Sequence, residues 1–140
     1  MGTARPREVT VFLNLLDNDE KHAFAELAEM MIKSDGLVIG REEAALASLK
    51  AEMGIAGSPG QARSIEDLAG VFRTWRSKIA AMLELVGLGY ADTNFSVDEK
   101  SMVHKLADHM GLTASELAEV EEWVREHVNL VRRALILMRD

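Results

Sequence analysis

The chain contains no cysteine and only two prolines in 140 residues. Disulfide bonds, thiolate nucleophiles and thiolate zinc sites are therefore excluded. Clusters of β-branched and aromatic residues, which are typical of strands, are nearly absent, and aromatic residues make up only 5% of the chain. No apolar run approaches the ~20 residues of a membrane-spanning helix, and no signal-peptide pattern stands at the N-terminus. We expect a cytoplasmic protein that does not insert into membranes.

Positive charge is also scarce, with 16 basic against 23 acidic residues and a net charge of −7. Residues 17–52 hold nine acids against four bases, and residues 92–127 hold nine against three. Nucleic acid is an unlikely partner, because neutralising phosphates requires a basic surface. The bases gather elsewhere, in a middle group and a C-terminal group: Arg63, Arg73, Arg76 and Lys78, then Arg132, Arg133 and Arg139. We expect one acidic face and one basic face.

What the sequence does contain is helical periodicity, with apolar residues at steps of three and four. Seven helical segments are expected, at about residues 9–16, 17–35, 42–54, a short one after Ser64, 74–88, 97–110 and 114–138, with Gly36 ending the second. With 48% hydrophobic residues, a chain of this length can bury a proper core. The predicted fold is all-α, one compact domain over residues 1–140.

The expected helix starts carry capping signals. Ser96 with Glu99, and Thr113 with Glu116, have the spacing of capping boxes. The last helix is the longest, and its apolar stripe comprises Leu117, Val120, Val124, Val128, Val131, Leu135 and Met138. Because Trp123, Leu130 and Leu137 widen this stripe, we expect the last helix to pack on several neighbours.

Two turns between expected helices have similar sequences. Residues 34–43 read S-D-G-L-V-I-G-R-E-E, and residues 91–100 read A-D-T-N-F-S-V-D-E-K. An offset of 57 positions aligns these turns, and the match extends through Met53-Gly54-Ile55 and Met110-Gly111-Leu112. We interpret this as an internal duplication of a helix-turn-helix unit, with repeat units of about 21–55 and 78–112.

The acidic residues of the two turns have two possible roles. Asp35 and Asp92 can bond to backbone amides of the turn, while Glu42 and Glu99 suit the first turn of a helix. Alternatively, the duplication brings these four carboxylates together, where they need a cation to offset their repulsion. An all-oxygen site of this kind suits Ca²⁺, Mg²⁺ or Mn²⁺. The spacing is not that of an EF-hand, because the twelfth residue from Asp35 is Leu46.

The D-G-x-[apolar]-x-x-x-E pattern, which the second copy repeats with Thr93 in place of glycine, is followed each time by a helix ending in M-G-[I/L]. This combination resembles the TerB-like family. That family covers tellurite-resistance proteins and the N-terminal domain of a membrane-anchored co-chaperone. The resemblance extends over roughly residues 10–138 and implies the duplicated, all-helical TerB fold. It also implies that Asp35, Glu42, Asp92 and Glu99 are candidate metal positions.

Two functions are consistent with these observations. The first is a non-enzymatic TerB-like module that binds a protein partner, a cation or both, with a role in tellurite resistance or stress response implied by the resemblance. The alternative is a small metal-dependent enzyme acting on a polar or phosphorylated substrate, with Mg²⁺ as Lewis acid. The sequence has no evident nucleophile, base or phosphate clamp, and we therefore favour the binding module.

Overall fold

The computed structural model describes residues 12–33, 47–48, 51, 63–91 and 96–139. All regular secondary structure in these ranges is helical, which confirms the all-α prediction for this part of the chain. The elements described are a short 3-10 helix η1 (Leu13–Leu15) and the α-helices α1 (Asn18–Ile32), α3 (Ile65–Ala69), α4 (Trp75–Ala91), α5 (Val97–Met110) and α6 (Ala114–Leu137). Of the predicted helix over 42–54, the structure describes only residues 47, 48 and 51, which are helical, so neither the count of seven helices nor the duplication is tested.

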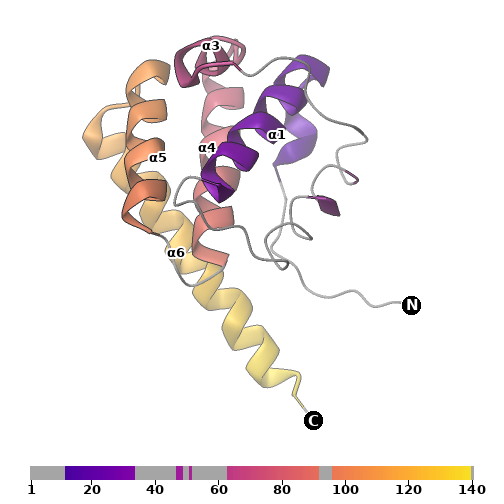
Figure 1. Ribbon diagram of the computed structural model, residues 1–140. Helices are drawn as coiled ribbons and strands as arrows, with labels where there is room; N and C mark the ends of the chain where they lie inside the picture. The colour runs from indigo at the N-terminus through magenta and orange to yellow at the C-terminus, as the bar shows by residue number, and fades with distance from the viewer. Residues whose placement is uncertain (1–11, 34–46, 49–50, 52–62, 92–95, 140) are drawn as a thin grey trace.

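Helix α4 is the centre of the bundle. It contacts α6, α1, α5 and η1, while α3 packs on α5 and α1 (Figure 1). Its position follows from its composition, because charged residues occur only at Arg76, Lys78 and Glu84 in 17 residues. A helix that is apolar on nearly all sides is stable only when neighbours surround it.

The core forms where the apolar stripes of the other helices meet α4. Its largest fully buried side chains come from α1, α3, α4 and α5: Phe24, Leu27, Met31, Leu68, Met82, Leu85, Val86, Val103 and Leu106. Burying a side chain of this size contributes roughly 1.5–3 kcal/mol. The predicted core spacing of these helices is therefore confirmed.

The predicted capping signals are present in the structure. Ser96 and Glu99 form a reciprocal capping box at the start of α5, and Thr113 and Glu116 form one at the start of α6. Helix α5 ends at Gly111, whose φ of 86° is left-handed and suits glycine. These local signals set the helix boundaries correctly, because each satisfies backbone N–H or C=O groups that the helix leaves unpaired.

Two predicted boundaries differ from the structure. The described part of the first expected helix is only the 3-10 turn η1, and Leu16 is extended with ψ 142° because α1 begins directly after it. Helix α4 continues to Ala91, three residues beyond the expected end at Leu88. Its glycines favoured an end there, but packing against α6 outweighs the ~1 kcal/mol that each glycine costs inside a helix.

Candidate functional site

Of the four carboxylates predicted to bind a cation, the structure describes only Glu99. Its Oε1 accepts the Ser96 N–H at 3.0 Å, and its own N–H donates to Ser96 Oγ at 3.1 Å. Glu99 is buried, so this capping box is shielded from water. Asp35, Glu42 and Asp92 lie outside the described residues. The geometry of Glu99 is that of a helix cap, and the proposed cation site stays a prediction.

Elsewhere in the described ranges, no group of three or more His, Asp or Glu side chains is arranged to hold a metal ion. The acidic side chains of α1 instead contact groups at the two ends of α3. The most buried of these is Glu20, which is 4% exposed. Its Oε1 accepts the Asp17 N–H at 2.9 Å, and its Oε2 accepts the Arg73 N–H at 3.1 Å. Glu20 thus caps α1 and also attaches the segment before α4 to it.

Two arginines extend this network on either side of α3. Arg63 binds the Glu26 carboxylate through Nη2 and, at 3.4 Å, through Nε. This hydrogen bond is the main reason that the pKa of Arg63 is raised. Arg73 makes longer contacts, with Asp17 at 3.4 Å and Asp19 at 3.5 Å. The Glu26 pair is the tighter one, because bidentate geometry and partial burial strengthen it.

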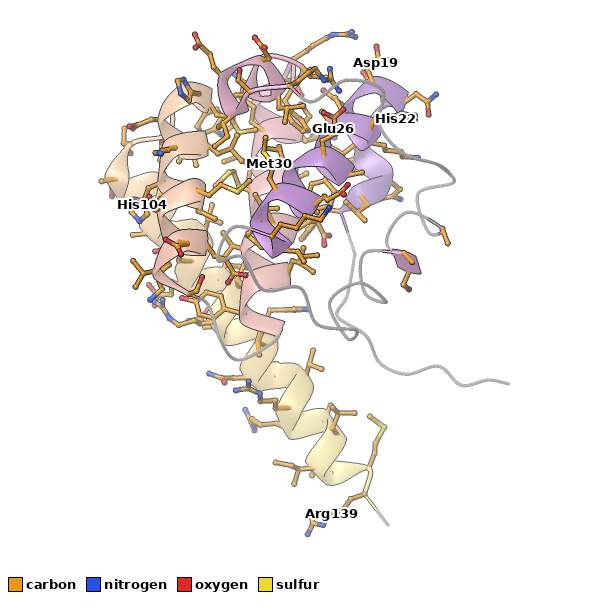
Figure 2. The ribbon with its side chains drawn as sticks, viewed as in Figure 1. Asp19, His22, Glu26, Met30, His104 and Arg139 are labelled. Atoms are coloured by element: carbon orange, nitrogen blue, oxygen red, sulfur yellow. The ribbon has the colours of Figure 1, made fainter. Side chains whose placement is uncertain are left out.

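A shallow cleft of about 390 Å³ opens between these elements, lined by Asp19, His22, Arg63, Gly70, Val71 and Arg73. Figure 2 shows Asp19, His22 and Glu26 along α1. His22 Nδ1 lies 2.9 Å from the Asn18 carbonyl oxygen, and both arginines contact carboxylates. The lining residues include no hydroxyl, thiol or lysine to act as a nucleophile. The arrangement holds α1 to the segments on either side of α3.

Helix α6 differs from the other helices because its second half leaves the bundle (Figure 1). Its first half is anchored on α4 through buried Leu117, Val120 and Val124. Residues 129–139, here called the arm, expose large apolar side chains: Leu130, Leu135, Ile136, Leu137 and Met138. Leu137 is 84% exposed. Contiguous exposed apolar surface of this kind marks interaction sites.

An aromatic cluster lies where the arm begins. The Trp123 ring is 5.6 Å from the Phe12 ring and stacks on His127 at 4.9 Å between ring centroids. Trp123 is still 41% exposed. Trp123, His127, Leu130, Ala134 and Leu137 are spaced alternately by four and three residues, so they follow one face of the helix. We call these five residues the α6 stripe.

The predicted basic face is not a single surface. Arg73 contacts Asp17 and Asp19 at one end of the molecule, and Figure 2 shows Asp19 at the opposite end from Arg139. The arginines of the arm therefore form a basic group of their own. The sequence prediction was wrong here because basic residues from different parts of the chain need not share a face once the helices pack.

No motif in the sequence predicts the network of Glu20, Glu26, Arg63 and Arg73. Glu26 and Arg63 are 37 positions apart. The two acids of the network, Glu20 and Glu26, are both buried on α1. Carboxylates in such positions nearly always have partners, since a buried charge is costly without one. The location of Glu20 on the apolar stripe, four residues before Phe24, was thus the one available clue.

Comparisons with known proteins add no assignment: no family model, curated protein or solved structure matches this chain. Among the described residues, no helix is long and apolar enough to cross a membrane. The TerB-like resemblance consequently rests on the two turn motifs alone.

Proposed function

We propose that this protein is a non-enzymatic, TerB-like helical module that works by assembling with other protein chains. The observation that supports this proposal most is the α6 stripe, which continues at heptad spacing beyond the bundle with Leu130 and Leu137 exposed. Burial of such side chains is the main source of binding free energy at protein interfaces. By resemblance, the cellular setting would be tellurite resistance or stress response.

The charged groups of the polar cleft also support a scaffold role. Its arginines are held by Glu26, Asp17 and Asp19, and Glu20 is occupied by two backbone N–H groups. Here the charged groups join helices, which suits a scaffold.

Cross-linking in intact cells tests the proposed function. The Leu130→Gln/Leu137→Gln double variant replaces two exposed apolar side chains without touching the core. We expect wild-type protein to form covalent adducts with other chains, and the double variant to form several-fold fewer at the same expression level. Val97→Gln is the matched control, because Val97 is also exposed but lies on α5. Equal adduct yields from wild type and the double variant would contradict the proposal.

A further inference from the structure

The charge of α6 reverses along its length. Residues 116–126 contain five glutamates and one arginine, whereas residues 127–139 contain three arginines and no acid. Glu119, Glu126 and Arg133 are all exposed and lie seven residues apart. Each precedes a stripe residue by four positions, so this charged line runs beside the α6 stripe on the same side of the helix.

A helix with opposite charges at its two ends is complementary to itself only when the second copy runs the other way. In a parallel pair, glutamates meet glutamates and arginines meet arginines. In an antiparallel pair, Arg133 of each chain lies beside Glu119 of the other. A twofold axis relates these contacts, so the same favourable pair occurs twice.

The apolar residues fit the same register. When Arg133 lies beside Glu119 of the second copy, the axis passes through residue 126, and Leu130 falls within one residue of Trp123 of the second copy. The two stripes then overlap from Trp123 to about Leu130, which is about 10 Å at 1.5 Å per residue. Leu137 of each chain lies beside residue 115 of the other.

We propose that α6 pairs antiparallel with α6 of a second copy of this chain, through the α6 stripe and the Glu119–Arg133 contacts. The inference rests on the proposed function, because it names the first protein chain that the stripe binds. An apolar contact of about one heptad is at the small end of specific interfaces, so the dimer is reversible.

Two other occupants fit the observations less well. Pairing of the arms alone would gather six arginines with no acid between them. An anionic membrane surface suits the arginines of the arm, but the stripe continues to Trp123, where exposed Glu119, Glu122 and Glu126 would be repelled. Only the antiparallel pair sets the glutamates of the first half of α6 beside the arginines of the arm.

Analytical ultracentrifugation with a charge exchange tests the proposal. Over roughly 1–500 µM, a range suited to a small interface, we expect a concentration-dependent dimer for the wild type. Arg133→Glu and Glu119→Arg should each raise the dissociation constant at least about tenfold. The double variant Glu119→Arg/Arg133→Glu should recover most of this loss. Arg76→Glu, on α4, should leave association unchanged.

The register also predicts a substitution that strengthens the dimer. Two Glu126 carboxylates approach each other at the axis, so Glu126→Gln should strengthen the dimer about threefold or more. A wild type that stays monomeric throughout, or a double variant no better than the single ones, would overturn the proposal. Circular dichroism melts confirm that each variant is folded.

The absence of cysteine allows the axis to be located by single-cysteine oxidation. Glu126→Cys should form a disulfide between copies, whereas Leu137→Cys should not, because antiparallel pairing separates the two Leu137 positions. Cross-linking at both positions would indicate a parallel pair, and at Leu137→Cys alone a contact between arm tips. Either result would overturn the antiparallel register.

Vesicle sedimentation distinguishes the proposed dimer from binding of the arm to a membrane. We expect no binding to phosphatidylglycerol–phosphatidylcholine vesicles at about 1:3. Binding that is lost in Leu137→Glu, with a monomeric protein in solution, would overturn the dimer and assign the arm to lipid. A monomer that still forms stripe-dependent adducts with a different protein in cells would overturn the dimer and leave the proposed function standing.

Discussion

Both halves of α6 contain apolar residues at steps of three and four, but only the first half is covered. Residues 114–128 bury Leu117, Val120 and Val124 against α4. In the arm, Leu135 and Met138, which continue that face, are exposed, as are Leu130 and Leu137 of the α6 stripe. Apolar periodicity therefore defines a face that has to be covered, without saying what covers it. In the first half the cover belongs to the same chain, and in the arm we assign it to a second copy.

The comparison is sharpest for two leucines on the same helix. Leu117 is 3% exposed and Leu137 is 84% exposed. We expect Leu117→Ala to cost about 2–5 kcal/mol of unfolding free energy, because it leaves a cavity between α6 and α4. Leu137→Ala should change the stability of the monomer by less than about 0.5 kcal/mol.

Urea unfolding at low protein concentration measures both values, since dilution removes any contribution of association. A loss above about 1.5 kcal/mol for Leu137→Ala would show that the arm is covered within its own chain. That result would remove the basis for an intermolecular surface.

Charged residues allow the same comparison between a covered and an uncovered contact in the polar cleft. Glu26 is largely buried and forms a close ion pair with Arg63. Asp19 is exposed, and its contact with Arg73 is longer, at 3.5 Å. We expect Glu26→Ala to cost about 1–3 kcal/mol, since it removes a charge-assisted, bidentate contact. Asp19→Ala should cost less than about 0.5 kcal/mol.

Thermal unfolding followed by circular dichroism distinguishes these two variants. Arg63→Ala together with Glu26→Ala should cost less than the sum of the single changes, because the two side chains act as a pair. Additive losses would mean that Glu26 stabilises α1 for reasons unrelated to Arg63.

Local and long-range features differ in how far the sequence predicts them. Caps such as Ser96–Glu99 were predicted because partners three residues apart satisfy the same helix end. The Glu26–Arg63 pair could not be predicted, because its geometry depends on how α1 and the segment before α3 pack. The end of α4 was also missed, since packing on α6 overrides the local preference of Gly87 and Gly89. The four turn carboxylates stay untested, as only Glu99 is described.

The capping boxes provide a comparison between the two turns. Glu99→Ala should cost about 0.5–2 kcal/mol, because the Ser96 N–H loses its acceptor inside a buried box. Glu42→Ala should cost less, since Ile39 stands where Ser96 does in the second copy and has no side-chain oxygen to complete a box. Urea unfolding of the two variants measures the difference. Equal losses would indicate that the glutamates share a role other than capping.

The smallest expected effect concerns cations. If Asp35, Glu42, Asp92 and Glu99 bound one ion in the folded state only, a tenfold excess over its dissociation constant would add about 1.4 kcal/mol. That corresponds to a rise of roughly 3–6 °C in the unfolding temperature. We expect no rise with millimolar Ca²⁺ or Mn²⁺, because the Glu99 carboxylate already accepts a backbone N–H. Differential scanning calorimetry with and without chelator makes the measurement. A rise that disappears in Asp35→Asn would establish the cation site, and the duplicated turns would then resemble each other through their ligand as well as through their sequence.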